Sequence, residues 1–493
     1  MSGRPFFKTR EVTLSCPHDE YIRGSKAIQR AFTFELMDMP QLKRYVDLMR
    51  EFGFNSVQLS ETWENYETAG WQISPRAFRA KLRAVADYAR SRGMKTTLFV
   101  WGTGPVDIYA NRGRMDDWRG WENLCPCLAG AMPKLRRHYA RQAALAPHFD
   151  HVITHWADPG GCQGGKCTFE TALRLHNEIL AAFRRENGAI RSTFSLWFFG
   201  AAAVPGCENW PGYKSFGDIL AAGILPEDVG FAQGGRFNLA EAKAIAKAGR
   251  RLGVWAWYLA DNEICPSLHV HTGIMGEYFS KLPREASRLA DWHTIDSNCH
   301  ILNLASLYAA AQLLKDPYCD LDGALADFCE FAFGPKISAE VGAAFRAVAQ
   351  TRCQSDYGRV RAPLEGVPIS SYLGDENEAP LGHRRTAMKA LETMRRLRPD
   401  AGYKSPLEPL VTVDFLLKAL KAHLERIGEF AEFRARLREL TRAKARISPA
   451  RLPKVAGAGE FMTQFEYKVY RWHLARLKKG PARLKREGRQ AST

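Results

Sequence analysis

The sequence predicts an α/β protein: a (β/α)8 TIM barrel followed by a C-terminal α-helical domain. Short β-rich runs alternate with amphipathic helical stretches, and eight such units fit into roughly 275 residues, the usual size of this barrel. A doubly wound sheet would favour a glycine-rich phosphate fingerprint after its first strand, and no such fingerprint is present. We therefore expect the barrel.

The β-rich runs are enriched in β-branched and aromatic residues and are bounded by turn formers. In chain order, the expected strands are Arg30–Leu36, Asn55–Glu61, Lys95–Trp101, His151–Asp158, Arg191–Phe199, Val229–Gly235, Gly253–Asp261 and Cys299–Ala305. The stretches between them, such as 40–53 and 78–93, place apolar residues at three- and four-residue steps and end at glycine. We expect these stretches to form the outer ring of helices.

After residue 305 the β-rich runs stop and helical patterns continue almost to the end of the chain. The expected domains are an N-terminal extension (1–28), the barrel (29–305), a helical domain (306–480) and a basic, disordered tail (481–493).

The charge of the chain is uneven. The net charge is +17, and residues 381–493 hold 27 Lys and Arg against 11 Asp and Glu. The rest is nearly neutral, so the charge says little about what the barrel binds. A solvated helical surface explains the basic segment, and we expect no nucleic-acid partner, while a homodimer through this segment stays open.

Location and thiol state are also predicted from composition. No apolar run approaches the roughly 18 residues that span a bilayer, and the first residues lack a secretory h-region, so we expect a cytoplasmic protein without a membrane partner. Cys125 with Cys127 and Cys162 with Cys167 form close pairs, but neither has the two-residue gap typical of zinc sites. We expect no metal and no cofactor. The spacing does not decide whether these cysteines are free thiols or form a disulfide.

The active site of such a barrel lies at the C-terminal ends of its strands, where this sequence gathers acids, indoles and amides. The candidates are Glu61, Trp101, His155, Trp156, Asp158, Trp197, Trp257, Asp261, Asn262 and Glu263. The Pro-Gly-Gly sequence after Asp158 ends the strand and leaves space for a ligand beside the backbone.

This combination suits a sugar, whose C–H faces pack on indoles and whose hydroxyls bond to carboxylates and amides. Glycoside hydrolysis typically uses two carboxyl groups, so we expect Asp158 to share acid and base duties with Asp261 or Glu263. Loops of ordinary length favour a pocket and hence an exo-acting glycosidase. The expected substrate-binding groups are Glu61, Asn262, His155 and the indoles of Trp101, Trp156, Trp197 and Trp257, of which strand alternation allows only some to point inward.

Residues 29–67, QRAFTFELMDMPQLKRYVDLMREFGFNSVQLSETWENYE, resemble the first two strands of glycoside hydrolase family 20, the β-N-acetylhexosaminidases. The resemblance implies that Arg30 is the sugar-binding arginine and Glu61 the acid of the second strand. It also implies a carbohydrate substrate.

Residues 302–335, LNLASLYAAAQLLKDPYCDLDGALADFCEFAFGP, resemble the helical part of α-glucuronidase-like exo-glycosidases. The chain departs from family 20 after the fourth strand. The family has an Asp-Glu pair there, whereas this chain has Asp158 followed by Pro159. The resemblance therefore does not extend to acetamido-assisted hydrolysis, and the acid must come from another strand end.

Two other functions stay open. His155, His269 and His271, with Asp158 and Glu61, have the donor types of a divalent metal site, which would make the protein a metal-dependent sugar isomerase or epimerase. The missing glutamate also fits a barrel that binds glycans without cleaving them. Hydrolysis survives a chelator and metal-dependent isomerisation does not.

Overall fold

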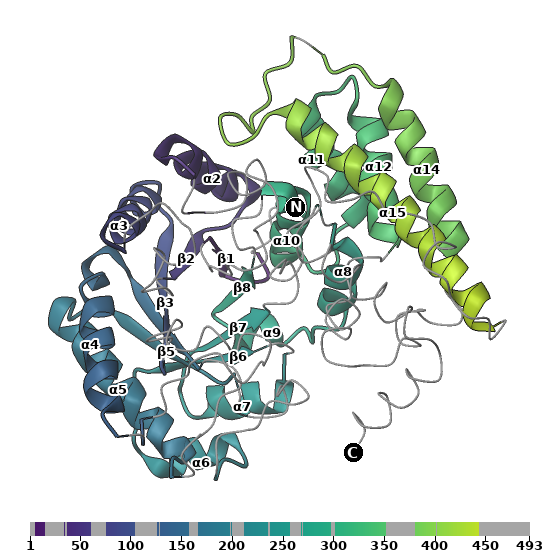
Figure 1. Cartoon of the computed structure of the whole chain (residues 1–493). Coiled ribbons are helices and arrows are strands. Elements are labelled where there is room, and N and C mark those ends of the chain that lie inside the picture. Colours follow the sequence, from purple (N-terminus) through teal and green to yellow (C-terminus); the bar gives the residue numbers. More distant parts are fainter. Residues whose placement is uncertain are drawn as a thin grey trace.

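The computed structural model confirms a closed barrel of eight parallel strands surrounded by helices, with further helices packed beside it (Figure 1). The structure describes residues 5–14, 34, 37–60, 75–103, 126–127, 129–156, 166–197, 199, 212–234, 237–256, 268, 270–296, 301–351, 380–400 and 402–442. The strands are β1 (Thr9–Thr13), β2 (Ser56–Ser60), β3 (Lys95–Trp101), β4 (His151–His155), β5 (Arg191–Ser195), β6 (Gly230–Gly234), β7 (Leu252–Ala256) and β8 (Trp292–Asp296). Each strand pairs with its sequence neighbour, and β1 pairs with β8.

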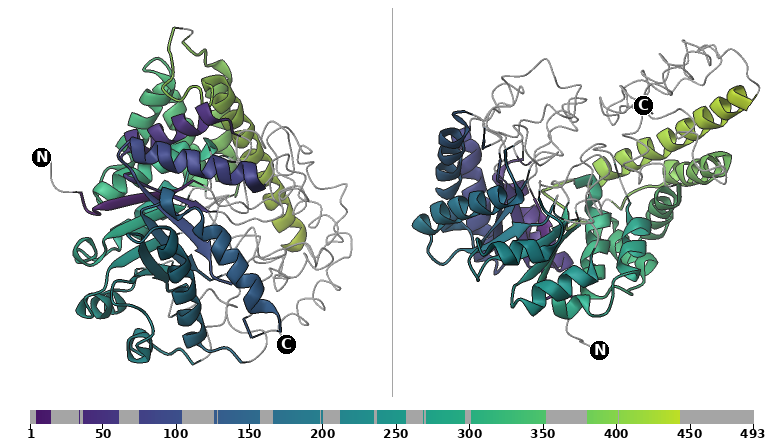
Figure 2. Two further views of the ribbon diagram at one scale, coloured as in Figure 1. Left: turned by 90° about the vertical axis from the view of Figure 1, so that its left-hand side faces the viewer. Right: turned by 90° about the horizontal axis from the view of Figure 1, so that it is seen from below.

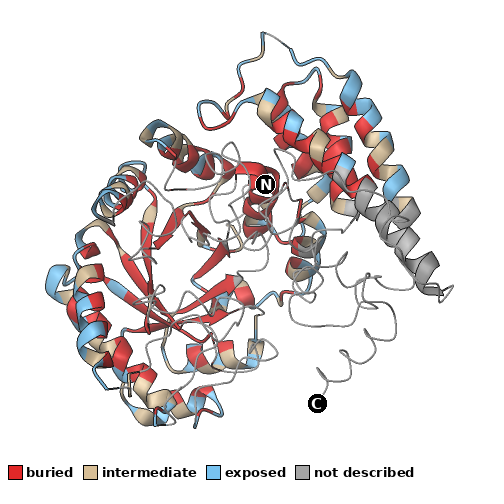
Figure 3. Ribbon diagram, viewed as in Figure 1, coloured by how far each residue is buried: buried red, intermediate tan, exposed pale blue. Residues whose placement is uncertain are grey.

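The helices of the ring follow the strands in order. They are α2 (Met39–Phe52), α3 (Pro75–Ser91), α4 (Ala131–Ala143), α5 (Phe169–Glu186), α6 (Phe216–Ala222), α7 (Leu239–Lys247), α8 (Thr272–Ser280), α9 (Ala286–Leu289) and α10 (Leu304–Lys315). Their inner faces are buried and their outer faces are exposed (Figure 3). Helix α2 shows why the sequence folds this way: Asp38 and Gln41 form a capping box at its start, and Gly53, at φ 116°, ends it.

Six expected strands are confirmed within a few residues, but the first and the last were placed wrongly. The barrel begins at β1, inside the segment expected to be an extension, and its last strand is β8. The run Cys299–Ala305 instead enters the 3-10 helix Ile301–Asn303 and then α10. An apolar run of this length does not distinguish a strand from a buried helix.

Strand β1 escaped detection because its interior residue is an acid. Glu11 is 2% exposed and accepts hydrogen bonds from Ser56 Oγ (2.7 Å), Thr97 Oγ1 (2.5 Å) and Thr294 Oγ1 (2.8 Å). These donors come from β2, β3 and β8, so the carboxyl group lies inside the barrel. Burial raises the pKa of Glu11, and the three hydroxyl groups and the charge of Lys95 oppose that rise.

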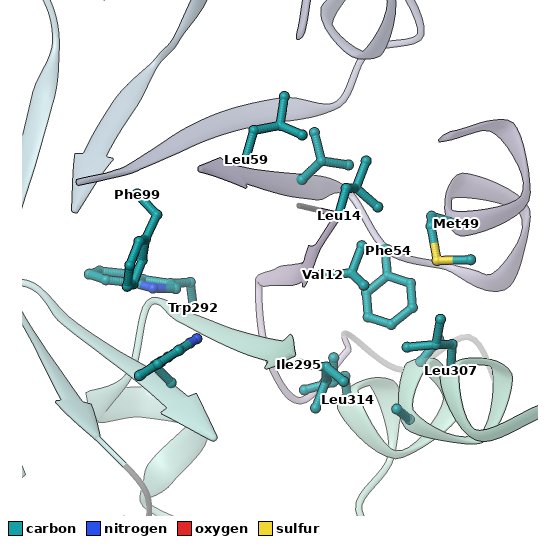
Figure 4. Close-up of a cluster of buried hydrophobic side chains, with 14 of the residues drawn as sticks. Val12, Leu14, Met49, Phe54, Leu59, Phe99, Trp292, Ile295, Leu307 and Leu314 are labelled. Atoms are coloured by element: carbon teal, nitrogen blue, oxygen red, sulfur yellow. The ribbon is translucent and has the colours of Figure 1, made fainter. Parts of the chain in front are cut away.

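Two layers of packing hold the barrel. Alternation along the strands turns Val12 and Ile295 outward, where they meet Leu314 of α10 (Figure 4). Phe99 and Trp292 lie on the interior side of the strands (Figure 4). Glycine makes room for the large interior rings.

Gly253 of β7 illustrates this close packing. A Cβ atom at this position would lie 1.9 Å from the indole of Trp292. A larger residue is therefore excluded unless the indole moves.

Helix α10 closes the ring. It contacts α2 and α8, and it is also latched to the start of the chain. The backbone N–H of Phe6 donates to Lys315 O (2.8 Å), and that of Phe7 donates to Leu314 O (3.1 Å). The barrel therefore extends beyond residue 305, where we expected it to end.

The remaining described helices form a bundle beside α10. They are α11 (Leu321–Phe333), α12 (Ser338–Thr351), α14 (Pro380–Arg396) and α15 (Val413–Arg442). Helices α14 and α15 lie side by side, and α15 extends away from the barrel (Figure 2). The segment between them is tied to both units, because Arg44 Nε of α2 donates to Pro406 O (2.6 Å) and Ser405 Oγ donates to Ala332 O (2.7 Å).

Among the described residues, none of the helices is long and apolar enough to cross a membrane.

Candidate functional site

The C-terminal ends of three neighbouring strands bring predicted site residues together. His155 ends β4, and its ring centroid lies 5.1 Å from that of Trp101, which ends β3. The indole of Trp197, just beyond β5, lies 5.5 Å from His155 on another side. Trp255 of β7 packs edge-on against the same imidazole at 4.6 Å. We call Trp101, His155, Trp197 and Trp255 the rim cluster.

His155 is held at a defined position in the rim cluster. Its Nδ1 atom lies 2.9 Å from Ser195 Oγ, and this oxygen also accepts the backbone N–H of Trp197 (3.2 Å). Phe99 packs beneath the imidazole, with a centroid distance of 5.0 Å. Burial among these rings lowers the pKa of His155 well below its usual range, so the imidazole is neutral at physiological pH.

The indole N–H groups of the rim cluster give it hydrogen-bonding capacity. Within the described part of the chain, the buried Nε1 atoms of Trp101 and Trp255 have no acceptor. A buried donor without a partner costs free energy, so an incoming oxygen atom that accepts from either group is favoured. The cluster therefore combines flat apolar faces with unused donors.

The position of Trp197 depends on a glycine in the neighbouring strand. A Cβ atom on Gly234 of β6 would lie 2.4 Å from the indole of Trp197. The small residue on β6 therefore sets where this ring can lie.

Trp156 was predicted as a stacking residue but is not brought into the rim cluster. It is 0% exposed and packs against Phe194, with a centroid distance of 5.4 Å. Its six-membered ring also covers Gly102, where a Cβ atom would lie 2.3 Å away. Since His155 faces the interior, alternation turns its neighbour Trp156 toward the helices.

The other predicted site residues lie outside the described residues: Arg30, Glu61, Trp257, Asp158, Asp261, Asn262 and Glu263. Their expected roles stay predictions. Along the chain, Glu61 is bonded to Ser60, the last residue of β2, and Asp158 comes three residues after His155. The described strands thus lead directly into the acid-bearing segments.

No metal site is evident in the part of the chain that is described: it contains no group of three His, Cys, Asp or Glu side chains that could hold an ion. Asp158 and Glu61 are outside that part, so the metal-dependent alternative is not tested. Cys125 and Cys162 are outside it too.

Sequence reasoning missed the part that Trp255 plays. Strand seven carries two tryptophans, and we expected Trp257 to stack on the ligand. In the structure Trp255 shares the interior face of β7 with Gly253, two residues before it. No pattern in the sequence indicated that the hydroxyl group of Ser195 would contact His155.

Comparisons with known proteins find likeness only among solved structures. No protein-family model and no curated protein matches the chain. The structure titled CpGH84B is 11% identical, with 99% of this chain and 77% of that chain covered and a TM-score of 0.48. A β-N-acetylhexosaminidase from Bacteroides fragilis is 11% identical, with coverages of 62% and 66% and a TM-score of 0.37.

A third similar structure is the GH20 exo β-N-acetylglucosaminidase from Vibrio harveyi in complex with N-acetylglucosamine. It is 12% identical, with 70% of this chain and 59% of that chain covered and a TM-score of 0.40. At such identity the likeness concerns the fold alone.

Proposed function

We propose that the protein is a glycoside hydrolase that binds its sugar at the C-terminal rim of the barrel. The observation that supports this most is the rim cluster. Its indole faces suit the C–H faces of a pyranose, and the buried N–H groups of Trp101 and Trp255 suit hydroxyl oxygens. Neutral His155 offers a further polar contact without charge.

The acid and base of this proposal are carboxyl groups rather than the imidazole. His155 has its pKa lowered by burial, so it is a poor general acid near neutral pH. We infer that Asp158 and either Asp261 or Glu263 share the two roles. Glycosidases of both stereochemical classes use such a pair.

Substrate binding is assigned to residues near that pair. Arg30, Glu61 and Asn262 contact sugar hydroxyls, together with the indoles of the rim cluster. The enzyme acts on the end of an oligosaccharide or on a simple glycoside.

The first experiment is a screen of chromogenic glycosides, including uronides, with and without a chelator. Release of the chromophore that is insensitive to the chelator supports the proposal. An isomerase or epimerase releases no chromophore, so that alternative is favoured instead by interconversion of free sugars that disappears with the chelator and returns with a divalent ion. Binding of oligosaccharides without any cleavage favours the non-catalytic barrel.

A variant pair then tests the assignment of the acid. Asp158→Asn is expected to lower kcat by at least about 100-fold, because general acid or base catalysis contributes on this scale. The matched control is Asp327→Asn, on the exposed face of α11 in the helical bundle, and it is expected to keep full activity. Unchanged turnover in Asp158→Asn would remove this residue from the mechanism.

A further inference from the structure

The N-terminal mouth of the barrel, opposite the rim, carries a cluster of basic side chains. Lys95 begins β3, Arg191 begins β5, and Arg251 comes immediately before β7. In these barrels one layer of the interior is contributed by alternate strands, and β1, β3, β5 and β7 are such a set. Thr9, at the start of β1, completes the layer. We call Lys95, Arg191 and Arg251 the basic mouth.

Contacts and alternation place these side chains at the mouth. Lys95 Nζ donates to Thr9 Oγ1 at 3.4 Å, across the intervening β2. Arg251 Nη2 donates to Asp228 O (3.0 Å) and Ser192 O (3.3 Å), so its guanidinium reaches across the start of β6 toward β5.

Arg191 shares its face of β5 with an interior residue. Thr193 Oγ1 lies 2.8 Å from His151 Nε2 inside the barrel. Two residues along a strand return to the same face, so Arg191 starts on the interior face.

The nearby carboxylates Asp150, Glu11, Asp228 and Asp291 oppose the repulsion in the basic mouth through their charges but form no ion pair with it. Asp150 accepts from the backbone N–H of Thr96 (2.9 Å) and lies 3.9 Å from Arg90 of α3. Asp228 pairs with Arg184 of α5.

The two remaining acids near the mouth do not form ion pairs with it either. Glu11 is turned to its three hydroxyl donors, and Asp291 acts on Arg251 only through its field. Among the described residues, no carboxylate lies within ion-pair distance of Lys95, Arg191 or Arg251.

The cations are close enough to affect one another. Burial lowers the pKa of Lys95, and the charges of Arg191 and Lys8 lower it further. Burial and then Arg191 likewise lower the pKa of Arg251. The fold thus holds like charges together at a partly buried place, and a bound anion would relieve that repulsion.

The neutral imidazole of His151 lies on the barrel-interior side of the basic mouth. His151 packs against Trp292 with a centroid distance of 5.3 Å, and its Nε2 atom lies 2.8 Å from Thr193 Oγ1. Burial, followed by the three cations, lowers the pKa of His151 well below its usual range. The imidazole therefore adds a polar surface without adding another charge.

We propose that the basic mouth is a binding site for a small tetrahedral oxyanion, a phosphate or a phosphate monoester, separate from the sugar site at the rim. The guanidinium of Arg191 offers paired N–H donors that match phosphate oxygens, Arg251 adds its charge and the N–H groups that its two carbonyl bonds leave unused, and the lysine adds a point charge. The site does not depend on the proposed hydrolase activity.

The test is the thermal unfolding of the full chain during a titration with inorganic phosphate at constant ionic strength, with sodium chloride as the balancing salt. Phosphate also stabilises proteins weakly through exclusion from their surface, and this effect does not saturate. The wild type is expected to show an additional, saturable rise in Tm. Absence of a saturable rise overturns the proposal.

Arg191→Gln removes one cation and Arg385→Gln is its matched control, an exposed arginine on α14 in the bundle. Arg191→Gln is expected to raise the apparent Kd for phosphate about tenfold or more, equivalent to a loss of about 1.4 kcal/mol of binding free energy. It relieves repulsion, so its Tm without phosphate stays equal to or above that of the wild type. An equal phosphate response in both variants overturns the proposal.

A parallel titration with glycerol 3-phosphate identifies the source of the anion. A tighter response to the monoester assigns the site to a phosphorylated metabolite, and an equal or weaker response assigns it to free phosphate. Lys95→Met, which keeps the aliphatic stem, is expected to weaken both.

Discussion

Replacing Thr97 by valine tests the buried carboxylate in the barrel. Valine has nearly the shape of threonine, so the change removes one of the three donors to Glu11 and leaves no cavity. Glu11 is 2% exposed, so water does not replace the lost donor. Thr97→Val is therefore expected to destabilise the protein.

The magnitude follows from the kind of hydrogen bond that is lost. A buried polar group that loses a hydrogen-bond partner costs about 1–3 kcal/mol, and the remaining donors, Ser56 and Thr294, stay in place. We expect a loss near the middle of that range, about 2 kcal/mol. Urea unfolding followed by tryptophan fluorescence measures it as a lower midpoint at unchanged slope.

Thr154→Val is the matched control. Thr154 is also a fully buried strand threonine, but its Oγ1 atom has no partner in the described structure. Removing an unsatisfied buried hydroxyl group is expected to be neutral or stabilising. Equal midpoints for Thr97→Val and Thr154→Val would refute the view that the Thr97 hydroxyl group stabilises the buried carboxyl group of Glu11.

Three further variants test the barrel interior. The folded-state pKa of Glu11 is raised above 4.5, so the folded state holds the proton more tightly than the unfolded state does. The free energy of unfolding therefore falls as pH rises from that value. Glu11→Gln should not show this fall when its urea midpoints at about pH 4 and about pH 8 are compared. Gly253→Ala should cost about 1–3 kcal/mol, seen as a lower Tm, because its Cβ would lie 1.9 Å from Trp292. Gly234→Ala should displace Trp197 and weaken sugar binding while circular dichroism stays unchanged.

The sequence predicted the barrel architecture correctly but misplaced the first and the last strand of the barrel. Six strands with central apolar residues, such as Lys95–Trp101, were found because alternating units repeat at a regular interval. Strand β1 was missed because reading for apolar runs treats Glu11 as a surface residue, whereas three hydroxyl groups from other strands make its burial tolerable. Those partners are distant in sequence, so no local pattern reveals them.

The rim cluster could be predicted in part. Trp101, His155 and Trp197 come from strand ends, where barrel geometry directs attention. The face on which a strand tryptophan lies depends on the register of its strand, which turns Trp255 of β7 inward and Trp156, beside β4, outward. A shift of one residue reverses every side chain, so composition alone does not settle it.

The latch between the start of the chain and α10 bears on how the protein is made. Strand β1 leaves the ribosome before the other strands, yet its partner β8 and the residues that hold Phe6 and Phe7 appear roughly 280 to 310 residues later. Until β8 emerges, the nascent sheet has two open edges with unpaired backbone groups, which invite pairing with other chains. The interval between synthesis of β1 and synthesis of β8 is thus the period in which the nascent barrel is most open to pairing with other chains.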